Sequence, residues 1–361
     1  MQLELRNVCK DVGTAMHLSD ISLTLDAGTL NILLGPTLSG KTSLMRLMAG
    51  LDQPTSGSIL QDGRDLSGVP VQKRNVAMVY QQFINYPNLT VYENIASPLR
   101  IAKVSREERN KIVHRVAELL KLTDMLKRHP QELSGGQQQR TALARALAKG
   151  ADLVLLDEPL ANLDYKLREE LREELPKIFS ETGAIFVYAT TEPSEALLLG
   201  GKTATLHEGK VSQFGSTVEV FRKPNDLITA QTFSDPPLNL LPVTKSGSSF
   251  AHNGHVVIPL TDKRLTDLED GSYTIAFRPY HLDLSGGNGS TIAIKASVVI
   301  TEITGSESFI HIDIDGVRWV VLTHGIHFFD IGEIIEVFLN PDYLYVFRED
   351  SSLAATPKVS V

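Results

Sequence analysis

Residues 35–42 carry the sequence pattern that most restricts what this chain can fold into. They fit G-x-x-x-x-G-K-[ST], follow a short apolar stretch, Asn31–Leu34, and open a helical stretch, Lys41–Ala49. A strand, a glycine-rich turn and a helix in this order bring backbone N–H groups and the positive end of a helix around one anion. They therefore predict a phosphate-binding loop, whose residues are Gly35-Pro36-Thr37-Leu38-Ser39-Gly40-Lys41-Thr42.

The last two residues of this loop have the side chains that a nucleotide site needs. The ammonium group of Lys41 can reach the β- and γ-phosphates, and the hydroxyl of Thr42 can coordinate Mg²⁺. A second acidic element follows the apolar stretch Leu153–Leu156, namely Asp157 and Glu158. We expect Asp157 to hold the metal, directly or through water, and Glu158 to polarise an attacking water. Together the two elements predict a nucleotide-hydrolysing site.

The first part of the chain alternates between strand-like and helical stretches, which predicts an α/β domain with a mainly parallel, helix-covered sheet. We place this domain at residues 1–232, with a helical subdomain at about 83–150, and expect Pro176 to kink or end the last long helix. The expected strands are Thr29–Leu34, Val76–Tyr80, Leu153–Leu156 and Ala184–Tyr188, and the expected helices are Lys41–Ala49, Glu107–Leu122, Gly136–Lys149 and Tyr165–Ile178.

A break at Asp235-Pro236-Pro237 precedes a region of different character. Residues 236–350 contain strands and turns with almost no helical pattern, and Asp315-Gly316 between two alternating stretches is a strong hairpin signal. We predict a small all-β barrel there, followed by a tail over 351–361.

Charge and cysteine content narrow the environment in which the chain works. A formal net charge of −8 argues against a general nucleic-acid binder. The single cysteine, Cys9, cannot form an internal disulfide, and no apolar run approaches the roughly 18–20 residues that cross a bilayer. We expect a cytoplasmic protein held at a membrane by partners.

The segment between the phosphate loop and the acid pair carries a family resemblance. Leu133-Ser134-Gly135-Gly136-Gln137 precedes a helix and resembles the signature sequence of the ABC ATPases. The resemblance implies ATP as substrate and two facing ATPase domains, in which Ser134, Gly135, Gly136 and Gln137 close on the partner's ATP. Gln81 resembles the glutamine that senses Mg²⁺ and the transmembrane partner. Leu160-Ala161-Asn162-Leu163-Asp164 resembles the loop that crosses the dimer interface.

The resemblance extends to the sugar and polyol importers of the maltose and glycerol-phosphate type. It rests on residues 233–242, on Phe277-Arg278-Pro279-Tyr280-His281-Leu282 and on Leu339-Asn340-Pro341-Asp342. It implies an oligonucleotide-binding-fold-like regulatory domain, transmembrane permease subunits, indirectly a solute-binding protein, and a place at the cytoplasmic face of the bacterial inner membrane. Residues 86–99 resemble the region that receives the permease, which favours transport over the ABC ATPases of DNA repair or translation.

Three positions depart from the family pattern. Val12 stands where relatives carry an aromatic residue that stacks on adenine, and Leu38 stands where they carry a further glycine. Thr191 occupies the place of the switch histidine, and a threonine can donate one hydrogen bond to a γ-phosphate but cannot carry positive charge. The loop residues together with Thr191 look most like the two-ATPase glycerol importers.

Two interpretations follow from these departures. In the first, the chain is an ATP-hydrolysing motor subunit, for which a homodimer with slow turnover through Glu158 and Thr191 remains possible. In the second, it is a hydrolysis-impaired nucleotide-binding subunit that supports an active paralogue in a heterodimer, the assembly that the substitutions favour.

Overall fold

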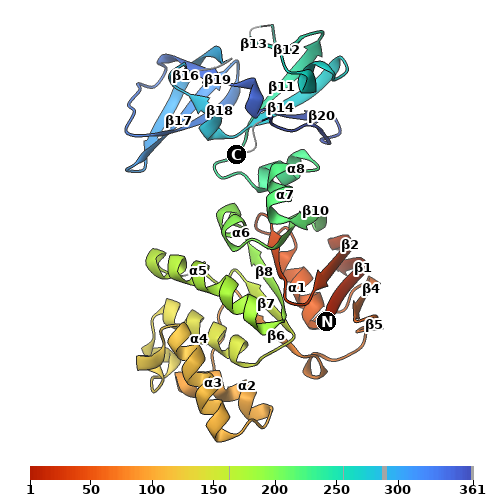
Figure 1. Ribbon diagram of the computed structural model, residues 1–361, viewed down its shortest axis with the longest axis vertical. Helices are drawn as coiled ribbons and strands as arrows, with labels where there is room; N and C mark the ends of the chain where they lie inside the picture. The colour runs from red at the N-terminus through yellow and green to blue at the C-terminus, as the bar shows by residue number, and fades with distance from the viewer. Residues whose placement is uncertain (162, 255, 287–290, 359–361) are drawn as a thin grey trace. The chain divides into compact units, whose positions relative to one another are not determined.

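The structure is a computed structural model that describes residues 1–161, 163–254, 256–286 and 291–358. It divides into two compact units, Met1–Val218 and Glu219–Val361 (Figure 1). Each unit has a sheet-based core of its own, and each is described separately below.

A six-stranded sheet forms the centre of the first unit. Its strand order is β10-β9-β3-β8-β7-β6, with parallel pairing from β6 to β9 and an antiparallel β10 at the edge. Every residue of β3, β7 and β8 is buried, as expected for strands covered on both faces. The bounds are β3 Leu30–Leu34, β6 Val76–Val79, β7 Leu153–Asp157, β8 Ile185–Thr190, β9 Lys202–His207 and β10 Lys210–Ser216.

A second, antiparallel sheet of the first unit was not predicted from the sequence. Its order is β2-β1-β4-β5, with bounds β1 Gln2–Val12, β2 Ala15–Asp26, β4 Ser56–Gln61 and β5 Arg64–Asp65. The helix α1, Lys41–Ala49, shares one hydrophobic cluster with both sheets, in which Leu3, Met45 and Leu155 represent the three elements. This cluster fixes the start of α1 against the central sheet.

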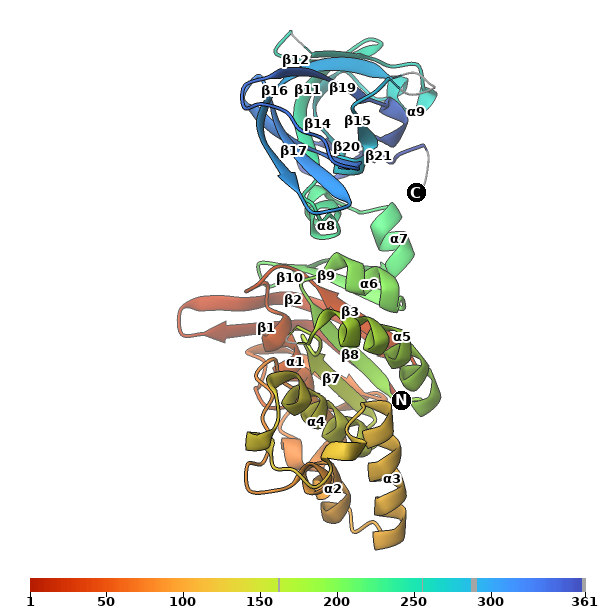
Figure 2. The same cartoon turned by 90° about the vertical axis from the view of Figure 1, so that its left-hand side faces the viewer.

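Three helices of the first unit lie near the predicted stretches 107–122, 136–149 and 165–178, and two more, Val91–Ile101 and Pro193–Leu199, were not predicted. The helices α2 Val91–Ile101, α3 Arg106–Leu119 and α4 Gly135–Ala148 contact one another and gather at one end of the unit, within the predicted helical segment (Figure 2). The helix α5, Tyr165–Thr182, continues through Pro176, so the proline does not end it. The short helix α6 spans Pro193–Leu199.

The second unit is built mainly of antiparallel strands, as the all-β prediction requires, and these strands form two sheets. The strand orders are β13-β12-β11-β14-β20-β21 and β15-β19-β16-β17-β18. The bounds are β11 Asn239–Ser246, β12 Ser249–His252, β13 Val256–Pro259, β14 Gly271–Phe277, β15 Leu282–Asp283, β16 Ile292–Ile303, β17 Glu307–Ile314, β18 Val317–His324, β19 Ile334–Leu339, β20 Tyr345–Arg348 and β21 Leu353–Ala355. A helical turn, α9 Lys263–Thr266, lies between β13 and β14.

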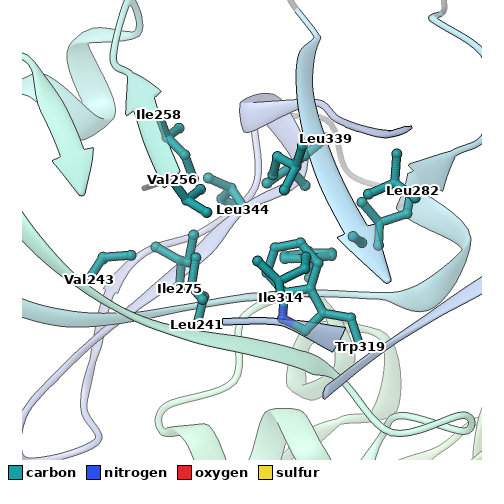
Figure 3. Close-up of a cluster of buried hydrophobic side chains, with 14 of the residues drawn as sticks. Leu241, Val243, Val256, Ile258, Ile275, Leu282, Ile314, Trp319, Leu339 and Leu344 are labelled. Carbon is teal, nitrogen blue, oxygen red and sulfur yellow. The ribbon is translucent and has the colours of Figure 1, made fainter. Parts of the chain in front are cut away.

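Apolar side chains from both sheets fill the core of the second unit (Figure 3). Trp319 is fully buried, packs edge-to-face on Phe277 with ring centroids 4.8 Å apart, and donates its indole N–H to the Leu240 carbonyl oxygen at 2.8 Å. The predicted hairpin joins β17 to β18, and Asp315 and Gly316 both have positive φ, 49° and 84°, as this two-residue turn requires.

The division after Val218 falls earlier in the chain than the predicted end of the first domain at residue 232. The intervening segment contains the end of α7, Thr217–Arg222, and all of α8, Leu227–Thr232. It belongs to the second unit because Arg278 lies over the ring of Phe221, 4.0 Å from its centroid, and donates to the Phe233 carbonyl oxygen at 3.1 Å.

Candidate nucleotide site

The phosphate loop turns the chain from β3 into α1, as the sequence predicts. Gly40 is the N-cap of α1 and has φ 104°, and its carbonyl oxygen accepts from the Leu44 N–H at 2.9 Å. Gly35 lies so close to β9 that a Cβ atom there would overlap the Leu206 carbonyl oxygen. The loop is therefore held between a strand end and a helix N-terminus, the arrangement that directs backbone N–H groups at an anion.

Lys41 is 5% exposed, and its ammonium group lies within the loop. Its Nζ donates to the carbonyl oxygens of Gly35 at 2.8 Å and Pro36 at 2.9 Å. Burial lowers the pKa of Lys41, and the nearby carboxylates of Glu158 and Asp157 oppose that shift. Two backbone oxygens thus hold the Nζ atom of Lys41 beside the loop, near the two acids.

The loop meets the acid pair through a direct hydrogen bond. The Thr42 hydroxyl donates to Asp157 Oδ2 at 2.7 Å, across 115 positions of sequence. Asp157 ends β7 and is 4% exposed, so burial raises its pKa, while the Thr42 hydrogen bond and Lys41 lower it. A hydroxyl and a carboxylate this close form the hard oxygen donor set that Mg²⁺ prefers, so these two residues fit the metal.

Glu158 follows directly and has a strained backbone, with φ 46°. Its Oε2 accepts from Gln81 Nε2 at 2.9 Å, so the residue predicted to polarise water and the residue predicted to sense the metal touch each other. Burial raises the pKa of Glu158. Lys41 lowers it, and the carboxylates of Asp157, Glu195 and Glu192 raise it further.

A cleft of about 490 Å³ lies over these groups. It unites seven residues that the sequence singled out: Thr37, Leu38, Gly40, Lys41, Thr42, Gln81 and Glu158. Its remaining wall was not predicted and consists of Met16, His17, Ser43, Glu208 and Gly209. Gly209 comes beside the loop because its N–H donates to the Ser39 carbonyl oxygen at 3.0 Å, and no local sequence signal announces that pairing.

Of the three positions that depart from the family pattern, Val12 and Thr191 lie outside this wall. Val12 is 51% exposed at the end of β1 and does not line the cleft, so its contact with a base stays a prediction. Thr191 is exposed just after β8 and does not line the cleft either. Leu38, by contrast, lines the cleft with 96% of its surface exposed and φ 67°, a left-handed conformation that disfavours a branched side chain.

The segment resembling the signature sequence forms the N-terminus of α4. The Ser134 hydroxyl accepts from the Gln137 N–H at 3.4 Å, and the Gln137 side-chain oxygen accepts from the Ser134 N–H at 3.0 Å. This capping box leaves Gly135 and Gly136 in the first helical turn. None of these four residues lines the cleft described above. Asn162, from the segment resembling the dimer-interface loop, lies outside the described residues.

The proteins that this chain resembles in sequence agree with a nucleotide-binding site. The chain is 36% identical over 337 residues to the trehalose/maltose import ATP-binding protein MalK of Thermococcus litoralis, with 88% of this chain and 90% of the relative covered. The chain belongs to the ABC transporter ATP-binding proteins. The sequence model of the family described as ABC transporter matches residues 18–161. That range contains the phosphate loop, the signature segment and the acid pair, whereas Val12 and Thr191 fall outside it.

A further relative spans nearly the whole length of this ABC ATPase. The xylose/arabinose import ATP-binding protein XacJ of Haloferax volcanii is 32% identical, with 98% of this chain and 95% of the relative covered. A solved dimeric structure of the ATP-binding cassette MJ0796, bound to ADP and Pi, superposes with a TM-score of 0.55 at 31% identity. The superposition covers 60% of this chain and 98% of the MJ0796 chain. Among the described residues, no helix is long and apolar enough to span a membrane.

Proposed function

We propose that this ABC ATPase drives the import of a small sugar or polyol, with glycerol as the candidate solute. The observation that carries the ATPase part is that two hydrogen bonds meet at one loop, from Lys41 to the Gly35 carbonyl oxygen and from Thr42 to Asp157. They place a phosphate-binding cation beside a metal-binding pair. Import of a sugar is supported by relatives whose names are those of trehalose/maltose and xylose/arabinose import proteins. Glycerol is supported by the resemblance of residues 35–42 and Thr191 to the two-ATPase glycerol importers.

The chain's own residues divide the chemistry between them. The loop N–H groups and Lys41 bind and orient the β- and γ-phosphates, while Thr42 and Asp157 would hold Mg²⁺, which neutralises phosphate charge when bound. Glu158 accepts a proton from the attacking water, and Gln81 holds its carboxylate in place. Thr191 offers one hydroxyl donor to the γ-phosphate.

The signature segment acts on a second ATPase subunit in this proposal. Its four residues do not line the cleft built by the same chain's phosphate loop, so each cleft needs a partner to supply them. We favour a paralogous partner with an intact switch histidine, and a homodimer is the alternative. Permease subunits would hold the pair at the cytoplasmic face of the membrane, in indirect contact with a solute-binding protein.

A hydrolysis-impaired role is the second candidate, and Thr191 is the residue that favours it. A neutral hydroxyl cannot stabilise the charge that develops on the γ-phosphate as an imidazolium can. In this role the chain holds ATP, and its signature segment completes an active site on the partner.

Steady-state ATPase activity of the purified chain tests both candidates, measured for the parent and for Thr191→His and Glu158→Gln. Ser194→His is the matched control, because it adds a histidine at an exposed position three residues away. Low activity that rises with Thr191→His but not with Ser194→His supports the impaired site. Ordinary activity, abolished by Glu158→Gln and unchanged by Thr191→His, supports a self-sufficient motor. Binding of a fluorescent ATP analogue is measured in parallel, and its absence would refute both.

Loss of solute uptake after deletion of the chain from its native cell tests the transported class. Labelled glycerol, xylose and maltose are compared. Glycerol uptake that depends on the chain supports the proposal, and dependence of maltose or xylose uptake alone would replace glycerol with a sugar.

A further inference from the structure

Two segments of the ATPase unit carry the residues to which the proposed function assigns hydrolysis. One follows β7 and contains Glu158, and the other follows β8 and contains Thr191. The strands are parallel neighbours, and the Glu158 N–H donates to the Ala189 carbonyl oxygen at 3.0 Å. The pairing of β7 with β8 ends at Asp157 and Ala189, so side chains are needed to fix the geometry of the residues that follow.

Arg168, in the first turn of α5, contacts both segments. Its Nη2 donates to the Ala161 carbonyl oxygen at 3.1 Å, and its Nη1 pairs with Glu192 Oε1 at 2.9 Å. A guanidinium group is planar and presents several donors in a rigid fork, so one side chain can hold two acceptors at a fixed spacing. The residues held are three positions beyond Glu158 and one position beyond Thr191.

A buried network anchors the second segment. Arg172, one turn along α5, pairs with Glu192 Oε2 at 2.8 Å and with Glu195 Oε1 at 3.3 Å. The other oxygen of Glu195 accepts from the hydroxyls of Tyr188 at 2.9 Å and Thr190 at 2.7 Å. Arg172 and Glu195 are buried, so both residues that flank Thr191 are tied to the interior of the unit.

The two arginines therefore do different things. Arg172 pairs with Glu192 in the segment after β8 and with Glu169 of its own helix. Arg168 instead contacts both segments, Glu192 after β8 and the Ala161 carbonyl oxygen after β7. Arg168 does not line the nucleotide cleft, so its removal should leave nucleotide contacts in place.

We propose that Arg168 is a positioning residue for ATP hydrolysis: by binding Ala161 and Glu192 together, it fixes Thr191 relative to Glu158. The inference rests on the proposed function, in which Glu158 and Thr191 act on the same nucleotide. A shift of either segment would misalign the attacking water and the γ-phosphate, which lowers the rate without lowering nucleotide affinity.

The first test compares kcat and nucleotide affinity among Arg168→Gln, Arg168→Lys and the parent. We expect Arg168→Gln to lower kcat by about tenfold or more, with the Kd of a fluorescent ATP analogue changed less than about twofold. Arg168→Lys should recover part of the loss, because it keeps the charge but not the fork. The matched control is Glu170→Gln, on the same helix, whose ion pair with Lys121 lies on the surface and should be dispensable.

A double-mutant cycle isolates the contact itself. Arg168→Gln and Glu192→Ala remove the two ends of one link, so the double variant should have the kcat of the slower single variant. Losses in kcat that simply multiply would mean that the residues act separately, and the proposal would be overturned.

Amide hydrogen exchange tests the link without relying on activity. Arg168→Gln should speed exchange in peptides covering 159–164 and 189–194, and Glu170→Gln should speed neither. Unchanged exchange in 189–194 overturns the proposal, whatever the ATPase result. If instead the parent hydrolyses ATP no faster than Glu158→Gln, the assignment of hydrolysis to this site fails, while the exchange experiment still decides whether Arg168 joins the segments.

Discussion

Acid pH should destabilise the second unit through the buried side chain of His281. The side chain is 8% exposed and stacks on Tyr343, with ring centroids 4.2 Å apart and planes 14° from parallel. Among the residues that the structure describes, neither ring nitrogen finds a hydrogen-bond partner. Burial, and secondarily the charge of Arg278, lowers the pKa of His281 from 6.5 to about 4.

The sign of the effect follows from proton linkage. The pKa of His281 is lower in the folded state, so the unfolded chain binds more protons between the two values, and stability falls as pH falls through that window. With an unfolded pKa of 6.5 and a folded pKa of about 4, the free energy of unfolding should be about 2 kcal/mol smaller at about pH 5 than at about pH 7. Below the folded pKa the loss should level off.

The single tryptophan provides the assay, because Trp319 lies in the core of the same unit. Its fluorescence should report urea unfolding of the second unit in the full chain, measured from about pH 5 to about pH 7. His281→Phe keeps the ring and its stacking but cannot titrate, so the pH dependence should shrink by about 2 kcal/mol relative to the parent. His324→Gln, at an exposed position of the same unit, is the control. A His281→Phe variant with the parent's pH dependence would refute the reasoning.

Three further variants test local claims about the ATPase unit. Leu38→Gly should raise the free energy of unfolding of the ATPase unit by up to about 1 kcal/mol in thermal denaturation. Glycine relieves the positive φ at this position, and no buried contact is lost. A loss of stability would contradict this reasoning. Lys41→Ala should weaken binding of a fluorescent ATP analogue by about tenfold or more, since it removes the charge beside the loop, and unchanged affinity would exclude Lys41 from the site. Arg74→Met should lower the free energy of unfolding by about 3 kcal/mol, measured by urea unfolding, because the buried Arg74 guanidinium donates to the carbonyl oxygens of Met48, Leu66 and Val69. A loss below about 1 kcal/mol would mean that water replaces those hydrogen bonds.

The features that the sequence predicted well are those set by neighbouring residues. The helix after the phosphate loop spans Lys41–Ala49 as predicted, because Gly40 caps its start and Gly50 its end. The hairpin at Asp315-Gly316 has the predicted turn, since two residues with positive φ suffice to define it. The buried strands β7 and β8 were found from apolar runs, with their ends displaced by one or two residues.

The features that the sequence did not predict depend on pairing between distant segments. The strands β1 and β2 pair with several register shifts, and their alternation is interrupted accordingly. The cleft wall at Glu208 and Gly209 exists because the turn between β9 and β10 bonds to Ser39 on one side and Ser19 on the other, at 3.0 and 2.8 Å. Such contacts are decided by tertiary packing, which local propensity does not contain.

The proposed function assigns the site residues to different steps of the reaction, and Thr191, which departs from the family pattern, belongs to the hydrolytic step. It assigns nucleotide and metal binding to Lys41, Thr42 and Asp157, whose hydrogen bonds are already made within the chain. It assigns hydrolysis to Glu158 and Thr191, and of these only Glu158 lines the cleft, where it accepts a hydrogen bond from Gln81. Because the substitution at Thr191 removes charge stabilisation that matters chiefly in the transition state, it should lower kcat and leave ground-state binding almost unchanged. If the proposed heterodimer forms, this subunit should hold ATP for longer than an intact partner takes to hydrolyse its own. One nucleotide would then stay bound through several turnovers of the other.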